Sequence, residues 1–150
     1  MNLLEKYAAK LPDSYKNFIA SYHDGFAMDG VALLGDPEYL YRIDLFGKHQ
    51  LHEWIEDDSI HTFLAEYLGE LIKQIRDHFK GGCTLDENDQ VISLDRLENS
   101  FVIGDANGDL MYLDFNDGGT VWLFYSDGGD VLKLADSFDE LQKRIENGSS

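Results

Sequence analysis

From Phe101 onward the hydrophobic residues follow a period of two, which is typical of β-strands. Four short apolar runs, at 101–103, 110–115, 120–125 and 131–134, are separated by loops rich in glycine, aspartate and asparagine. The Asp-Gly and Asn-Gly pairs in these loops favour the positive backbone φ angles of hairpin turns. The sequence therefore predicts an antiparallel meander, in which each strand pairs with the next one along the chain.

The lengths of the loops predict which side chains share a face of the meander. Joining Phe115 to Thr120 across the first loop aligns Leu113 with Trp122. The face expected to be buried under helices is then apolar throughout: Met111, Leu113, Phe115, Trp122, Phe124, Leu132 and Leu134. The opposite face is mixed, and we expect it to meet water or a partner: Tyr112, Asp114, Val121, Leu123, Tyr125 and Lys133.

Hydrophobic residues recur at steps of three and four in four other segments, and this spacing predicts helices. The first covers residues 4–11, and Pro12 ends it and opens a second. The longest and most regular covers residues 59–80. The last begins at Ser137, which together with Glu140 predicts a capping box.

Residues 31–34 and 39–46 are expected to form two further short strands. The 150 residues show no linker-like change of composition and no internal repeat, so we predict a single domain spanning residues 1–150. Its class is α+β: an antiparallel or mixed twisted sheet with a C-terminal meander, packed by helices at both termini and by one long middle helix.

The chain carries 29 acids against 12 Lys and Arg, a formal net charge of −17. Such a charge repels phosphate backbones and anionic membrane surfaces, so we expect neither nucleic acid nor membrane as a partner. It favours a cationic partner, although solubility alone would also explain it. The single cysteine, Cys83, excludes an internal disulfide and is expected to be structural. Because no run resembles a signal peptide or a membrane span, we expect a cytoplasmic protein.

The usual motifs of catalysis are missing from the sequence, which has neither a Gly-x-Ser-x-Gly elbow nor a glycine-rich phosphate loop. His49 and His52 lie three apart, but their spacing supplies no third or fourth zinc ligand. Asp105, Asn107 and Asp109 alternate as calcium ligands do, but the glycine and glutamate of an EF-hand are missing. We expect no enzyme activity, no metal and no cofactor; a small metal-dependent hydrolase using these loops is the enzymatic alternative.

Negative charge is concentrated in the meander, because residues 97–132 contain seven acids and no Lys or Arg. Turns prefer aspartate for reasons of backbone geometry, and this preference alone would explain the pattern. The functional interpretation is a negative rim flanked by tyrosines, which would steer and contact a basic protein. The predicted partner-binding residues are Asp105, Asp109, Tyr112, Asp114, Asp117, Tyr125 and Asp127.

Three short segments are distinctive in their order along the chain. They are LPDSYKNF at 11–18, IGDANGD at 103–109 and ADSFDE at 135–140. The first resembles the opening helix of the SUKH superfamily (Smi/Knr-like), the second its glycine–aspartate strand motif, and the third the start of its closing helix. The resemblance implies an α+β fold with a sheet packed by helices, and it brings no catalytic residues with it.

The resemblance also implies a function, because most bacterial members of the superfamily look like immunity proteins that neutralise a toxin, often a nuclease domain. A nuclease presents a basic cleft that an acidic protein can occupy. We therefore expect a protein that binds and neutralises a basic toxin domain through an acidic surface. The alternative is a non-catalytic regulatory or scaffold module of the Smi/Knr type that binds a non-toxin partner.

Overall fold

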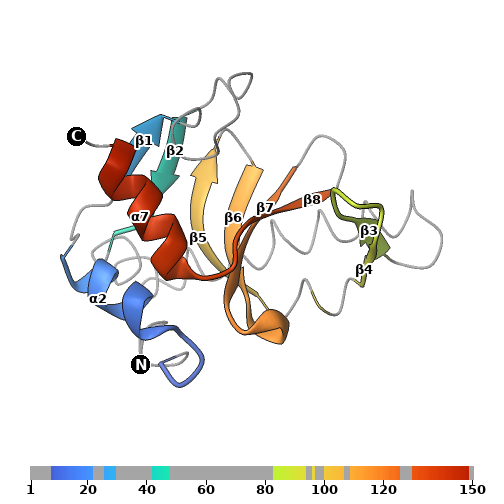
Figure 1. Cartoon of the computed structure of the whole chain (residues 1–150), viewed down its shortest axis with the longest axis horizontal. Helices are drawn as coiled ribbons and strands as arrows, with labels where there is room; N and C mark the ends of the chain where they lie inside the picture. Colours follow the sequence, from blue (N-terminus) through green and yellow to red (C-terminus); the bar gives the residue numbers. More distant parts are fainter. Residues whose placement is uncertain are drawn as a thin grey trace, which may run out of the picture.

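The computed structural model describes residues 8–21, 26–29, 42–47, 83–93, 96, 100–106, 109–125 and 130–148. This part of the chain contains two α-helices, one 3-10 helix and eight strands, so the predicted α+β class is confirmed. The two helices lie together against the sheet, and a small hairpin lies at the opposite end of the molecule (Figure 1). Within these ranges, no helix combines the length and the apolar character needed to cross a membrane.

The main sheet has six strands in the order β1-β2-β5-β6-β7-β8, and every neighbouring pair is antiparallel. Its strands are β1 (Phe26–Asp29), β2 (Arg42–Leu45), β5 (Ser100–Ala106), β6 (Asp109–Asp114), β7 (Thr120–Phe124) and β8 (Val131–Ala135). The last four follow one another in both chain and sheet order, which confirms the predicted C-terminal meander. Strand β2 falls within the run predicted at 39–46.

Two strands that the periodicity did not predict, β3 (Cys83–Leu85) and β4 (Val91–Ser93), form a separate two-stranded hairpin. Each has three residues, too few for an alternating pattern to be recognised. The predicted strand at 31–34 and the predicted long helix at 59–80 lie outside the described residues. So do residues 4–7 of the first predicted helix, and residues 8–10 form a turn instead of a helix.

Helices α2 (Asp13–Ser21) and α7 (Phe138–Gly148) pack against each other, so the expected packing by helices at both ends of the chain is confirmed. Their contact is aromatic: the ring of Phe138 lies edge-on to Tyr15 at 5.1 Å and to Phe18 at 5.2 Å. Tyr15 also meets Phe101 of β5 edge-on at 6.0 Å, which attaches α2 to the sheet. Such edge-to-face pairs add to the free energy of burying the rings.

The predicted capping box at the start of α7 is confirmed in its first half. The backbone N–H of Glu140 donates to the hydroxyl of Ser137 at 3.3 Å. The carboxylate of Glu140 reaches back one residue further than expected and accepts from the N–H of Asp136 at 3.2 Å. Two N–H groups around the start of the helix therefore have side-chain partners.

The predicted register between β6 and β7 is wrong by one residue. Asp114 pairs with Thr120 and Tyr112 with Trp122, because Phe115 leaves the strand and begins the 3-10 helix η1 (Phe115–Asp117). The loop therefore has five residues rather than four, and Gly118 and Gly119 complete it with positive φ angles of 67° and 85°. An odd change of loop length turns every side chain of β7 to the other face.

The same shift changes the expected division into a dry and a mixed face. Every residue of β6 and β7 is buried, so the prediction that one face meets water or a partner is wrong for these two strands. Leu113 and Val121 share a face with Phe101, which contacts the helices, whereas Tyr112 and Trp122 lie on the opposite face. Trp122 pairs in turn with Lys133 of β8, a neighbour that the predicted register excluded.

Gly104 shows why the glycine–aspartate motif of β5 contains a glycine. The register of β5 and β6 shifts between Val102 and Gly104, which brings the backbone close to β2. A Cβ atom at Gly104 would lie 2.8 Å from the carbonyl oxygen of Asp44 and 3.0 Å from Cδ2 of Leu45. Because the first of these atoms belongs to the backbone, no side-chain rotation relieves the clash.

Gly104→Ala should lower the free energy of unfolding by about 2 to 3 kcal/mol, because β2 must move away from β5. The matched control is Gly118→Ala, whose Cβ would have no atom within 4 Å but whose φ of 67° is unfavourable for alanine. The control should cost about 1 kcal/mol. Urea denaturation of both variants tests the difference, and equal destabilisation would contradict the role assigned to Gly104.

Candidate functional site

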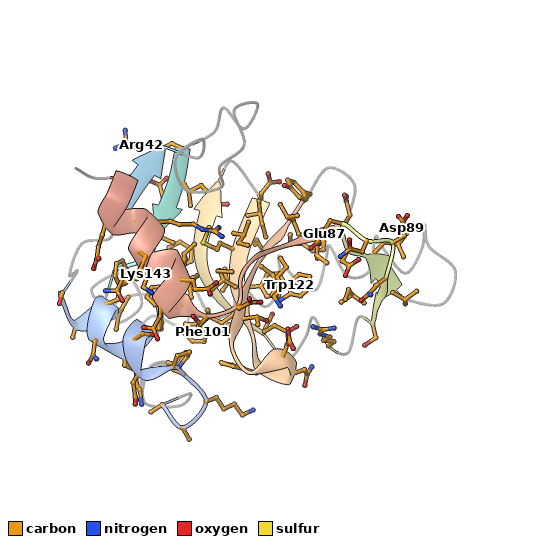
Figure 2. All side chains as sticks on the ribbon, viewed as in Figure 1. Arg42, Glu87, Asp89, Phe101, Trp122 and Lys143 are labelled. Atoms are coloured by element: carbon orange, nitrogen blue, oxygen red, sulfur yellow. The ribbon has the colours of Figure 1, made fainter. Side chains whose placement is uncertain are left out.

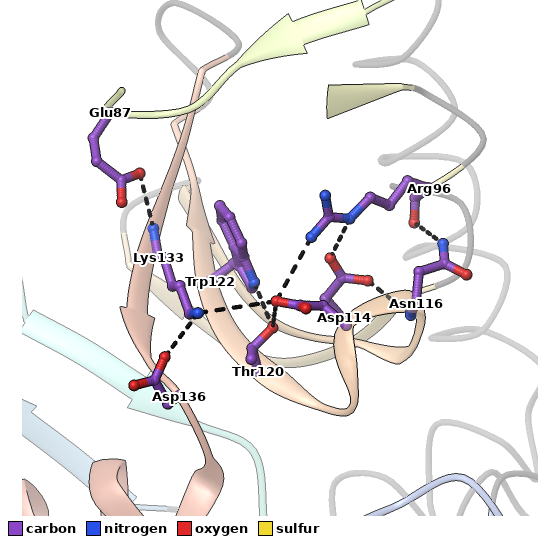
Figure 3. Close-up of polar contacts among 9 residues, drawn as sticks. Glu87, Arg96, Asp114, Asn116, Thr120, Trp122, Lys133 and Asp136 are labelled. Carbon is purple, nitrogen blue, oxygen red and sulfur yellow. Dashed lines mark hydrogen bonds and ion pairs between the residues drawn. The ribbon is translucent and has the colours of Figure 1, made fainter. Parts of the chain in front are cut away.

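Two of the predicted acidic residues, Asp114 and Asp117, lie at the turn between β6 and β7, where they take part in a polar network (Figure 3). Asp114, the last residue of β6, holds this turn through both of its carboxylate oxygens. Its Oδ1 accepts from the backbone N–H of Asn116 at 2.9 Å and so caps η1. Its Oδ2 accepts from Nε of Arg96 at 2.6 Å, a charge-assisted hydrogen bond.

Asp117 occupies the outer side of the same turn and lies between two cations. Its Oδ2 accepts from the hydroxyl of Thr120 at 2.9 Å and lies 3.7 Å from Nη2 of Arg96 and 4.0 Å from Nζ of Lys133. The ammonium of Lys133 also binds Oδ1 of Asp136 at 2.7 Å. That hydrogen bond raises the pKa of Lys133 and lowers the pKa of Asp136. Together these contacts place negative and positive groups alternately around the turn.

Aromatic side chains form the base of the network. Trp122 Nε1 donates to the Thr120 hydroxyl at 2.7 Å, and the guanidinium of Arg96 lies 5.4 Å from the centre of the Trp122 ring, within cation–π range. Burial raises the pKa of the Tyr112 hydroxyl, the charge of Asp114 raises it further, and Arg96 opposes the shift. Tyr112 therefore stays protonated over the physiological range.

The seven predicted partner-binding residues do not form one exposed surface. Asp109, Tyr112 and Asp114 are buried, with relative exposures of 8%, 4% and 2%. Strand pairing and the ion pair with Arg96 draw these three residues into the interior, so they are not exposed in the structure. Asp105 and Tyr125 are half-buried, and Asp117 is exposed. Asp127 lies outside the described residues.

Arg96 and Lys133 are the site residues that the sequence reasoning missed. They are the two bases that bound the base-free stretch at 97–132, one on each side. In the fold, both bases lie close to acids of that stretch. Arg96 pairs with Asp114, and both Arg96 and Lys133 lie near Asp117. Their position as the nearest bases in the chain was the signal that could have identified them. Much of the apparent negative charge at this turn is therefore compensated within the protein.

The residues of the network contact one another, and the ion pair between Arg96 and Asp114 attaches residue 96 to the sheet. In the part of the chain that the structure describes, no group of three or more His, Cys, Asp or Glu side chains is placed to hold a metal ion. His49, His52 and Asn107, considered above as metal ligands, lie outside that part. The chemistry of the described turn is thus that of ion pairing and hydrogen bonding.

The β3–β4 hairpin presents a different surface, at which the sequence analysis placed no contact residues. The Asp86 carboxylate accepts from the backbone N–H of Asn88 at 2.8 Å and of Gln90 at 2.9 Å, and these two hydrogen bonds close the turn. Leu85 and Val91 pair across the hairpin and are 42% and 65% exposed. Within the described ranges they are the large hydrophobic residues that remain exposed.

One contact attaches the tip of the hairpin to the main sheet. Oε2 of Glu87 accepts from the backbone N–H of Lys133 in β8 at 3.3 Å. Figure 2 shows Glu87 and Asp89 at the hairpin, at the opposite end of the molecule from Lys143 on α7. The hairpin is therefore held beside β8 and far from the helices.

Comparison with known proteins identifies one family. The model of the SMI1/KNR4 family (SUKH-1) matches residues 2–144. No curated protein and no solved structure matches the chain. The matched region includes all the described strands and the whole polar network, and the resemblance drawn from three short motifs is confirmed.

Asp114→Asn should lower the free energy of unfolding by about 2 to 4 kcal/mol, because it leaves the half-buried Arg96 with only the more distant and more exposed carboxylate of Asp117 as a counter-charge. The amide oxygen of asparagine can still accept from Asn116, so the cap of η1 is retained. Adding Arg96→Met removes both charges and should recover much of the loss. Chemical denaturation at neutral pH tests this, with the exposed Asp136→Asn as control; a loss no larger than that of the control would contradict a buried ion pair.

The stability of the protein should fall as pH rises above about 10, the ordinary pKa of tyrosine. Burial raises the pKa of Tyr15 and of Tyr112, so above that pH the folded state binds more protons than the unfolded state. Tyr15→Phe should make the fall shallower, by up to about 1.4 kcal/mol per pH unit. Among the described residues, the buried Tyr15 hydroxyl has no hydrogen-bond partner, so this variant should be at least as stable as the parent at pH 7. Denaturation curves across alkaline pH measure both slopes, and identical slopes would refute the assignment.

Proposed function

The chain belongs to the SMI1/KNR4 family (SUKH-1), and from this membership we propose that it is an immunity protein, which binds and neutralises a protein toxin. The family match over residues 2–144 is the observation that carries the proposal. The toxin is a basic domain, and a nuclease fits best. Neutralisation occurs by occupation of the toxin surface, with no covalent bond changed, in the cytoplasm where nucleic acids are found.

The charge of the protein supports a nuclease as the partner. A nuclease holds the phosphate backbone in a cleft lined with Lys and Arg. A protein with a net charge of −17 is attracted to such a cleft and offers carboxylates in place of phosphates. The same charge disfavours direct binding of this chain to nucleic acid or to an anionic membrane.

The fold limits which carboxylates can take part in binding. Asp109 and Asp114 are buried, and Arg96 neutralises the second of them. Asp117 is 43% exposed but shares its charge with Arg96 and Lys133. The partner is therefore contacted mainly through carboxylates away from this turn, with Asp117 at the margin of the contact.

The proposal predicts that a neighbouring gene encodes a toxin domain, and that co-expression of this protein with that domain restores growth of the host cell. The purified pair should bind with an affinity that weakens about tenfold or more between roughly 0.05 and 0.5 M NaCl, because exposed charges are screened. Growth assays and titration calorimetry measure the two effects. A toxin that remains active would contradict the proposal, and capture of a different partner from the native cells would then favour the regulatory module. Affinity that does not change with salt would contradict the electrostatic part alone.

A further inference from the structure

We infer that the β3–β4 hairpin is the element that contacts the partner, an inference that rests on the proposed function and adds the surface to it. Its first support is the apolar pair that lies next to its turn. Leu85 and Val91 lie opposite each other in the hairpin, with 42% and 65% of their surfaces exposed. Adjacent exposed hydrophobic side chains on a stable element are typical of the centre of a protein interface.

Acidic residues surround this apolar pair. Asp86, Glu87 and Asp89 form the tip of the hairpin, and residues 81–95 contain no Lys or Arg. Unlike Asp114, whose carboxylate binds Arg96, Asp86 and Glu87 use theirs to accept backbone N–H groups. Hydrogen bonds from N–H groups leave the formal charges of these carboxylates in place; the charge of Glu87 also contributes to raising the pKa of Lys133. The hairpin therefore combines an apolar centre with a negative rim.

The hairpin is held in one conformation before any partner arrives. Asp86 closes the turn with its carboxylate and also donates its own N–H to the carbonyl of Gln90 at 3.0 Å. Asp89 adopts the left-handed conformation with a φ of 59°, which aspartate tolerates better than most residues. Glu87 attaches the tip to β8. A preorganised element loses little conformational entropy when it binds.

The charge of the hairpin selects its partner. A second copy of this chain would bring one acidic rim against another within a pair of molecules that each carry −17. An anionic membrane surface is disfavoured for the same reason. The partner that fits is a protein with an apolar socket for Leu85 and Val91, bordered by Lys and Arg. A basic toxin domain, as proposed above, has this charge.

Two pairs of substitutions test the two halves of this surface without disturbing its backbone. Leu85→Thr with Val91→Thr removes the apolar contact and retains high strand propensity. Glu87→Gln with Asp89→Asn removes two charges, while glutamine still offers an oxygen to the N–H of Lys133 and asparagine tolerates the left-handed φ. The matched control is Asp139→Asn with Glu146→Gln, two exposed acids on α7. It changes the net charge equally at the other end of the molecule.

The probe is the purified toxin domain that this protein neutralises in the growth assay described above, titrated against the parent and the three double variants. Each hairpin variant should bind about tenfold or more weakly, whereas the α7 control should lose less than about threefold. Circular dichroism and the melting temperature of each variant establish that it is folded. Hairpin variants that bind as well as the parent, or no worse than the control, overturn this inference and leave the proposed function standing. A parent protein that does not bind the toxin overturns the proposed function, and this inference with it.

Discussion

The carboxylate of Asp114 connects the backbone, the charge and the packing of the C-terminal half. By accepting from Asn116 it ends β6 one residue early, and the five-residue loop that results turns Trp122 toward the face of Tyr112. A buried carboxylate is unfavourable unless it is paired, and Arg96 supplies the counter-charge at 2.6 Å. The guanidinium in turn covers the Trp122 ring. Register, ion pair and aromatic packing therefore depend on one another.

This arrangement changes how the net charge of −17 can act on a partner. The longest acidic stretch without a base coincides with the buried strands of the meander, where Asp109 and Asp114 are removed from the surface. The two bases that border the stretch, Arg96 and Lys133, return to it in the fold. Local charge density along the sequence is thus a poor guide to surface potential here. For the basic partner proposed above, long-range attraction would still follow from the total charge, but close contact would need carboxylates outside this polar network.

The strands and the helix cap, which depend on short sequence patterns, could be predicted from the sequence. The strand register and the burial of the acids, which depend on a single side-chain hydrogen bond or on contacts distant in the chain, could not. The alternation after Phe101 predicted the meander, and the Ser137 cap predicted the start of α7. The register failed because it depends on a single hydrogen bond from Asn116 to Asp114, which composition does not reveal. The site was only partly predicted: its acids were found, but their burial follows from strands that are covered on both faces. An alternating pattern whose second face is partly apolar fits a strand covered on both faces as well as a strand exposed on one face.

A sheet whose central strands are buried on both faces has little surface of its own to offer, so recognition falls to its edges and loops. One edge strand, β8, already has the N–H of Lys133 occupied by Glu87, which limits the addition of a further strand there. The same contact places the β3–β4 hairpin at that edge as a separate two-stranded unit. Because Leu85 and Val91 are exposed, substitutions at these positions leave the buried cluster around Tyr15 and Phe138 unchanged. Under the proposed function, the contact surface can therefore change for a new partner without altering the packing that keeps the protein folded.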